Sequence, residues 1–412
     1  MLNKIRRNKT LVSNFGYLGL IQLATIVLPL VTYPYLIKIM GLELWGKIVL
    51  AQVIVSYLVM VINFGFDTVA TKKVSIYSED IEEISKIASD VLGVKLIIFM
   101  TLGLVYFSVL WLIDINHIDK EMLIYSYSAC IAELILPLWY FQGIEKMRNI
   151  AIINFISKSI LVGIIFIAIK EQSQYYLVPL FNSVGAIIGA LTGIVLMVKH
   201  GVKLKIPNWS KMTSLFKEGA AICFNRLLIS LKNRLNFFII ASLLGPVAVA
   251  VFDIAVKLLN VFTSFVNVIC RTIFPRYARN PSKTMIKKVI ILSASTTTLL
   301  LLFNVFLIDK IMFYLIGDTG AEYYTAIILV IVSVPFMTVG NILGMVVLNG
   351  NSEYKYILKG TFYTLGVYFL VLGFGYLFGF EFSLYLYAYS ILIIYIFECL
   401  YRMYICRAKG YI

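Results

Sequence analysis

Six basic side chains lie inside long apolar runs of the sequence, where packing alone does not explain them. They are Lys95, Lys158, Arg226, Lys232, Arg234 and Lys257. On insertion scales, a basic residue at the centre of a bilayer costs roughly 3 kcal/mol. Six without partners would therefore cost more than the ~5 to 15 kcal/mol that stabilises a typical protein. These side chains must line a wet cavity, pair with acids or reach the membrane surface.

Two of the six, Lys95 and Lys257, can be explained without a ligand. Lys95 lies near the predicted cytoplasmic end of its run, so we expect its long side chain to extend to the membrane surface. Asp253 and Lys257 are four residues apart and face each other on a helix. They form either a structural ion pair or a binding group in which the acid tunes the lysine.

The four remaining cations lie deeper in their runs, and they are Lys158, Arg226, Lys232 and Arg234. The acids in the middle of apolar runs that could neutralise them are Glu133 and Asp253, because Glu398 is expected to pair with Arg402 one turn further on. Cations in excess of acids favour a positively charged cavity. Such a cavity suits an anionic ligand such as a phosphate, which Arg binds in a fork and Lys as a point charge.

Neutral polar residues share helix faces with these cations. Asn260 follows Asp253 and Lys257 on one continuous face, and Asn233 follows Arg226 on another. We therefore predict a substrate-binding set consisting of Arg226, Lys232, Arg234, Lys158, Lys257, Asn233, Asn260 and Gln22. We predict no catalytic residue and no metal site, since the cysteines and the two histidines show no ligand spacing.

The composition indicates helices that cross a membrane and carry these residues. The chain has 412 residues, of which 61% are hydrophobic and 14% charged. A spanning helix needs about 20 apolar residues. Twelve runs meet that length: 11–37, 46–66, 90–113, 121–141, 150–169, 177–198, 217–243, 249–270, 286–308, 324–348, 358–378 and 382–405. We predict an all-α polytopic membrane protein with twelve transmembrane helices.

The distribution of basic residues predicts the orientation. Most of the 36 lysines and arginines fall in loops on the side of the N-terminus, and the opposite loops hold Lys38, Lys47, Lys120, Lys170 and Lys310. Positive loops stay in the cytoplasm. Both termini are therefore predicted to be cytoplasmic, and the net charge of +15 is assigned to topology and contact with anionic membrane lipids. It is poor evidence for nucleic acid, since no soluble basic domain carries it.

A weak internal repeat predicts two domains. Sliding the chain on itself by 204 residues places Gly41 on Gly245, Asn63 on Asn267 and Gln22 on Arg226. Six helices per half would make parallel bundles related by a pseudo-two-fold axis along the membrane normal. We predict an N-terminal bundle at 1–203 and a C-terminal bundle at 204–412, with the substrate between them.

Several motifs resemble a known family. They are Tyr33-Pro34-Tyr35-Leu36, Met40-Gly41 with Gly46, Asn63-Phe64-Gly65-Phe66, Ala70-Thr71-Lys72-Lys73, Trp139-Tyr140-Phe141-Gln142-Gly143, Glu145-Lys146, Leu244-Gly245-Pro246, Phe252-Asp253 with Lys257, and Phe274-Pro275-Arg276. The set resembles the Wzx-type O-antigen flippases, in the polysaccharide transporter family of the MATE-like MOP superfamily. Lys72 departs from the pattern, because such proteins often have Arg there.

The resemblance implies a function for the cationic cavity. Flippases of this kind move undecaprenyl-pyrophosphate-linked oligosaccharide, such as an O-antigen or capsule repeat unit, across the bacterial inner membrane by alternating access. A polysaccharide polymerase and chain-length machinery are partners that this implies. The resemblance also implies coupling to a proton or sodium gradient, for which Glu133 and Asp253 are the candidate acids. No other cofactor is expected.

Other functions remain open. A multidrug exporter of the same superfamily has the same architecture, although one that carries cationic drugs would need acids in its cavity. A membrane polysaccharide polymerase, which is an enzyme, usually has a large outside loop that the predicted topology lacks. A peptidoglycan-precursor flippase typically has two further helices. We therefore expect a flippase and no enzymatic activity.

Overall fold

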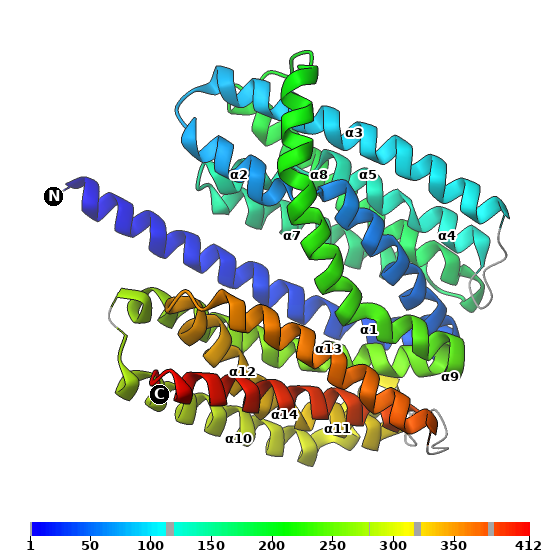
Figure 1. Ribbon diagram of the computed structural model, residues 1–412. Helices are drawn as coiled ribbons and strands as arrows, with labels where there is room; N and C mark the ends of the chain where they lie inside the picture. Colours follow the sequence, from blue (N-terminus) through cyan, green and yellow to red (C-terminus); the bar gives the residue numbers. More distant parts are fainter. Residues whose placement is uncertain (1, 113–118, 280, 317–322, 378–382) are drawn as a thin grey trace. The chain divides into compact units, whose positions relative to one another are not determined.

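The computed structural model describes residues 2–112, 119–279, 281–316, 323–377 and 383–412 (Figure 1). Within these ranges, the side chains of residues 2–30 and of some later positions, including Lys232 and Asn233, lie outside the described set. The chain divides into two compact units, Met1–Phe238 and Ile239–Ile412. This division falls within a long helix, and the predicted bundle boundary after residue 203 stays a prediction.

Helices form all the regular structure in the described ranges. Unit 1 contains α1 (Leu2–Asn63), α2 (Phe66–Ile76), α3 (Ile81–Leu112), α4 (Lys120–Ser126), α5 (Ser128–Ile135), α6 (Leu138–Gly143), α7 (Met147–Ala168), the 3₁₀-helix η1 (Gln172–Leu177) and α8 (Val178–Lys199). Helix α9 (Trp209–Arg279) begins in unit 1 and continues into unit 2. Unit 2 also contains α10 (Lys283–Ile316), α11 (Tyr324–Val332), α12 (Val334–Ile342), the π-helix η3 (Leu343–Leu348), α13 (Tyr354–Leu377) and α14 (Leu384–Ala408).

The helices confirm the predicted class of an all-α, multi-pass membrane protein. In the described ranges, ten helical stretches are long and apolar enough to cross a membrane. Two helices each cover two predicted runs: α1 contains 11–37 and most of 46–66, which it leaves at Asn63, and α9 contains 217–243 and 249–270. The count of twelve spans and the pseudo-two-fold axis stay predictions.

One glycine interrupts each of these two long helices. Gly41 in α1 has φ 77° and ψ 170°, and Gly245 in α9 has φ 80° and ψ −178°. This backbone region is essentially restricted to glycine because a Cβ is crowded there. The two glycines are the residues that the proposed repeat aligns, and both lie where the sequence predicts a loop between spans. The shared backbone conformation supports the repeat.

Alanine at either glycine is expected to destabilise the protein by about 1–3 kcal/mol. The cost would come from the backbone alone, since an added Cβ meets no atom within 4 Å at Gly41 or Gly245. Gly163 in α7 is the control, because its Cβ also meets nothing but its φ is not positive. Alanine there should be neutral or stabilising. Thermal unfolding in detergent tests this, and equal Tm values for all three variants would contradict the backbone argument.

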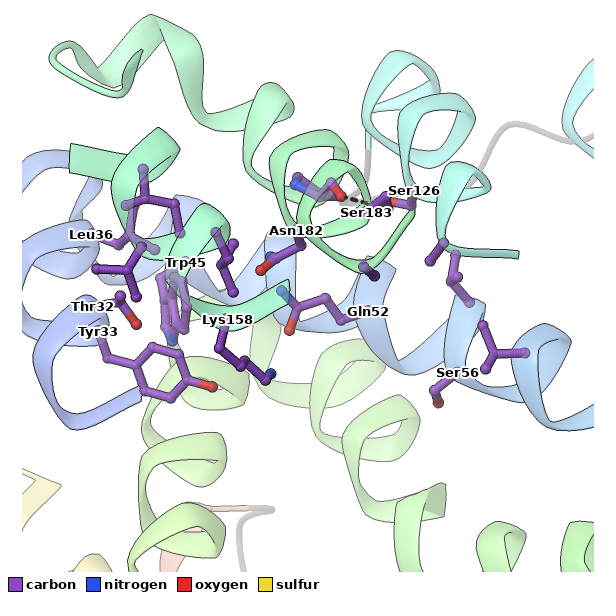
Figure 2. Close-up of a pocket in the computed structure, with 18 residues that line it drawn as sticks. Thr32, Tyr33, Leu36, Trp45, Gln52, Ser56, Ser126, Lys158, Asn182 and Ser183 are labelled. Atoms are coloured by element: carbon purple, nitrogen blue, oxygen red, sulfur yellow. Dashed lines mark hydrogen bonds between the residues drawn. The ribbon is translucent and has the colours of Figure 1, made fainter. Parts of the chain in front are cut away.

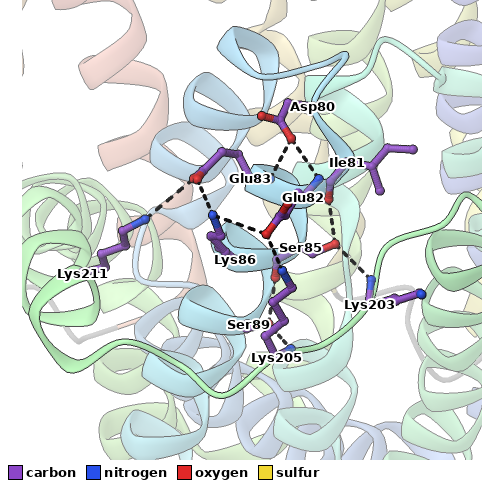
Figure 3. A network of polar contacts seen from close by, with 10 residues as sticks. All are labelled: Asp80, Ile81, Glu82, Glu83, Ser85, Lys86, Ser89, Lys203, Lys205 and Lys211. Carbon is purple, nitrogen blue, oxygen red and sulfur yellow. Dashed lines mark hydrogen bonds and ion pairs between the residues drawn. The ribbon is translucent and has the colours of Figure 1, made fainter.

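The non-helical segment 202–208, which connects α8 to α9, is held along the start of α3 by its backbone (Figure 3). The N–H of Lys203 donates to the hydroxyl of Ser85 at 3.0 Å, and the N–H of Lys205 donates to that of Ser89 at 2.7 Å. Both serine side chains are buried. Backbone donors outside regular structure need such partners, so these bonds fix the path by which the chain enters α9.

Side chains add further contacts to this connection. The N–H of Asn208 donates to the buried carboxylate of Asp90 at 2.7 Å. Lys205 also forms an ion pair with Glu82 at 2.9 Å, but both side chains are exposed. Exposed ion pairs contribute little, typically about 0–1 kcal/mol. The buried hydrogen bonds therefore hold the segment more firmly than its ion pairs do.

Candidate functional site

Unit 1 contains a cavity of about 360 Å³ among its own helices (Figure 2). Its wall consists of residues from α1, α4, α5, α7 and α8. The polar and aromatic residues that line it are Thr32, Tyr33, Trp45, Gln52, Ser56, Ser126, Lys158, Asn182 and Ser183, and the others are apolar. Its volume lies within the roughly 300–1,000 Å³ of small-molecule sites.

Lys158 is the one charged residue among those that line the cavity. Figure 2 shows its side chain close to those of Gln52 and Asn182, so that α7, α1 and α8 each contribute a polar group. All three residues are half-buried. Within the described part of the chain, no hydrogen bond or ion pair engages these three side chains. The cavity thus presents one cation and two amides that are available to a ligand.

Arg234 reaches the edge of the same cavity. Its guanidinium donates a hydrogen bond to the hydroxyl of Ser56, which lines the cavity. One turn before Arg234 on α9, the carbonyl of Ser230 accepts a hydrogen bond from Tyr57 at 3.3 Å. These contacts attach this part of α9 to α1 within unit 1. The structure therefore brings two of the predicted site residues, Lys158 and Arg234, to one place.

Arg226 is bound by an acid that the sequence analysis did not consider. Its guanidinium donates to both carboxylate oxygens of Asp67, at 2.7 and 2.6 Å, and to the hydroxyl of Thr68 at 3.2 Å. Both ionic side chains are about one-third exposed. Lys73 and Glu218 form a second ion pair between α2 and α9 at 2.8 Å. Arg226 thus fastens α9 to α2, and its predicted contact with substrate stays a prediction.

The expectation for Lys95 is wrong. Its side chain is 1% exposed and turns inward, where the ammonium donates to the Glu133 carboxylate at 3.1 Å and to the Glu133 carbonyl at 2.7 Å. Asn63 donates to the same carboxylate oxygen at 2.8 Å. A buried charge needs a partner of this kind, since an unpaired ammonium in an apolar interior is costly. The cluster joins the end of α1 to α3 and α5.

The predicted residues of unit 2 lie mainly on α9. Lys257 pairs with Asp253 at 2.5 Å, which confirms the ion pair between these two residues. Asn260, one turn further on, is exposed. Glu398 and Arg402 also pair as expected, at 2.5 Å. The Asp253–Lys257 pair leaves the predicted roles in ion coupling and substrate binding untested.

Three predicted site residues, Gln22, Lys232 and Asn233, lie outside the described side chains. Their roles stay predictions. The predicted cavity between the two bundles likewise stays a prediction, whereas the cavity described above lies within unit 1.

Close packing of α7 on α8 positions Lys158. A Cβ at Gly185 of α8 would lie 2.6 Å from the carbonyl oxygen of Ser157, and one at Gly189 would lie 2.7 Å from the Ser157 Cβ. Small residues four apart allow such close approach of membrane helices. Ser157 precedes Lys158, so this contact sets where the lysine enters the cavity. The spacing Gly185, Gly189 and Gly193 is visible in the sequence and could have indicated the interface.

The chain is similar to proteins of polysaccharide biosynthesis. Residues 11–281 match a family described as "Polysaccharide biosynthesis protein". A protein of Escherichia coli (strain K12) named "Putative O-antigen transporter" is 24% identical over 359 residues, which is 84% of this chain and 86% of that protein. A protein of the same name from Shigella dysenteriae is 24% identical over 290 residues, or 65% of this chain and 67% of that protein.

Solved structures share the fold. The structure "Lipid II flippase MurJ, inward closed conformation" superposes with a TM-score of 0.73 at 12% identity, covering 95% of this chain and 89% of that one. An inward-facing multidrug resistance MATE family transporter of the MOP superfamily gives a TM-score of 0.65 at 13% identity, covering 94% and 99%. At these identities the likeness concerns the fold alone.

Proposed function

Because this chain belongs to the polysaccharide biosynthesis protein family, we propose that it is a flippase for lipid-linked oligosaccharide. Its cargo would be an undecaprenyl-pyrophosphate-linked repeat unit of an O-antigen or capsule, moved from the cytoplasmic to the periplasmic leaflet of the bacterial inner membrane. The names of the relatives and the flippase among the structures of the same fold support this cargo.

One observation carries the proposal furthest, namely the chemistry of the cavity in unit 1. Lys158 supplies a positive charge in a partly apolar space, and Gln52 and Asn182 supply donors and acceptors. An anionic, hydroxyl-rich cargo such as a glycan diphosphate complements this combination. Arg234 would add a second cation at the edge by exchanging its bond to Ser56 for one to the cargo.

In the proposed cycle, the glycan and diphosphate occupy the polar interior while the lipid chain stays in the bilayer. Alternating access would expose this interior first to the cytoplasm, where both termini would lie, and then to the periplasm. Glu133 and Asp253 remain the candidate acids for proton or sodium coupling. Both are paired with a lysine, so coupling would require those pairs to open. A polymerase and chain-length machinery would act on the delivered cargo.

The sign of the charge argues against the main alternative, an exporter of cationic drugs. No Asp or Glu occurs among the described residues that line the cavity, whereas a lysine does. A cation would be repelled by Lys158 in this low-dielectric space. We also propose that the chain has no enzymatic activity of its own, since transport of an intact lipid-linked glycan makes and breaks no bond.

The test is export of surface glycan by variants of the cavity cations. Lys158→Gln is expected to reduce flipping by about 10- to 100-fold, because a charge-assisted hydrogen bond contributes about 1.5–3 kcal/mol. Lys158→Gln combined with Arg234→Gln should lower it further. Lys38→Gln is the control, since Lys38 is exposed and does not line the cavity. Normal export by the double variant at normal expression would refute the assignment of these residues.

A further inference from the structure

A second cavity is lined by residues of unit 2 alone and has no part in the proposed transport. It has a volume of about 210 Å³ and lies between α10 and α14. We name it the α10–α14 groove, lined by Lys287, Ile290 and Ile291 of α10, Leu343 of η3, and Met403 and Arg407 of α14, together with Ile412. Its size is below the roughly 300–1,000 Å³ of pockets for whole small molecules. It can hold a single headgroup but not an oligosaccharide.

The groove combines two cations with an apolar floor. Lys287 and Arg407 are exposed, whereas Leu343, which also lines the groove, is fully buried. Across the described residues, neither cation has a carboxylate within the 4.0 Å of an ion pair, and neither side chain forms a hydrogen bond there. Two cations facing one small space from different helices complement a doubly coordinated anion such as a phosphate.

The neighbouring charge is also positive. Lys283 and Lys288 of α10 are exposed beside the groove. Glu353, which precedes α13, forms an ion pair with Lys409 at 3.2 Å. The hydrogen bond from the Lys409 ammonium lowers the pKa of Glu353, so this carboxylate is charged and paired with Lys409. The side chains that line the groove therefore carry two positive charges and no carboxylate.

The position of the groove along the helices points to a lipid. Lys287 lies four residues after the start of the spanning helix Lys283–Leu307, and Arg407 lies one residue before the end of the span Leu384–Ala408. Both cations thus lie at a membrane surface, the predicted cytoplasmic one, where lipid phosphates are found. Ile291, a wall residue, is 66% exposed and would face the acyl chains. Basic pockets between membrane helices at this level bind anionic headgroups.

We propose that the α10–α14 groove is a binding site for an anionic phospholipid of the cytoplasmic leaflet. The headgroup phosphate would lie between Lys287 and Arg407, and one acyl chain would run over Ile290, Ile291 and Met403. This site is separate from the cavity of unit 1 and does not depend on the proposed cargo. It would give the protein a specific lipid requirement.

Lipid binding to the purified full-length chain tests the proposal. Native mass spectrometry in detergent would follow titration with phosphatidylglycerol and, in parallel, with phosphatidylcholine. In the variant Lys287→Gln/Arg407→Gln, affinity for phosphatidylglycerol should fall about 30-fold, from about 1 kcal/mol per basic residue. The control Lys355→Gln/Lys359→Gln removes the same charge from exposed positions of α13 that do not line the groove, and it should bind as the parent does.

Four results would contradict the proposed site. Equal binding by the groove variant and the parent would refute the headgroup contacts. An equal loss in the control variant would mean that only net charge matters. Displacement of the bound lipid by an equal concentration of glycerol phosphate would show that the acyl chain contributes nothing, and equal affinity for phosphatidylcholine would refute selection of an anion. Matching Tm values for both variants would confirm that each is folded.

Discussion

Replacing Glu133 by leucine is expected to destabilise the protein by about 3–5 kcal/mol, because removal of one partner of a buried ion pair leaves the other charge uncompensated. The Lys95 ammonium is buried, and Glu133 supplies both its carboxylate and its carbonyl as acceptors. With the carboxylate gone, only the carbonyl would remain. Asn63 would also lose the acceptor of its amide hydrogen bond.

A second substitution separates the charge effect from simple loss of packing. In Lys95→Met/Glu133→Leu both charges are absent, and apolar replacement of a buried pair is often neutral. We therefore expect the double variant to recover most of the stability lost in Glu133→Leu. Thermal and denaturant unfolding in detergent measure both. If the double variant were less stable than Glu133→Leu, the ion pair would not be the source of the effect.

Gly189→Val should destabilise the protein and also reduce transport. A Cβ at Gly189 would lie 2.7 Å from the Cβ of Ser157 and 3.0 Å from the carbonyl oxygen of Ile153. The larger valine side chain would therefore clash with α7. Overpacking of this kind costs typically about 1–3 kcal/mol and occasionally more. Since α7 would have to move, Lys158 would shift with it. Transport should therefore fall by more than the loss of folded protein explains.

The control for this prediction lies on the same helix as Lys158. Gly163→Ala adds a Cβ to α7 where no atom lies within 4 Å, so it should not lower stability and should leave export unchanged. Export divided by the amount of folded protein in the membrane is the quantity to compare. A Gly189→Val protein with normal specific export would show that the α7–α8 contact does not position the cavity lysine.

Much of the fold could be predicted because apolar length alone identifies a spanning helix. The class, the family resemblance and the breaks near Gly41 and Gly245 were all visible in the sequence and are confirmed. Such features depend on local composition and backbone preference. Local reasoning also identified the Asp253–Lys257 pair, whose members are one helical turn apart.

The partners of Lys95 and Arg226 could not be predicted in the same way. Glu133 is 38 residues from Lys95, and Asp67 is 159 residues from Arg226. Position along a helix gives the depth of a side chain, but the direction in which it points depends on which helix faces meet. The position of Lys95 along its helix suggested that its side chain reaches the membrane surface, whereas in the fold it pairs with the Glu133 carboxylate inside unit 1. The cavity within unit 1 was not predicted, because it too depends on which helix faces meet. The sequence analysis expected the substrate between the two bundles.

The connection between α8 and α9 should tolerate changes of amino acid far better than changes of length. Ser85 and Ser89 are one helical turn apart, about 6 Å, and two residues of extended chain cover about 6.6 Å. This match lets Lys203 and Lys205 both reach a hydroxyl through their amides, whatever their side chains are. Inserting one residue between Lys203 and Lys205 would point the amide of one of them away from its serine hydroxyl. Among related sequences, indels should therefore be rare here even where identity is low.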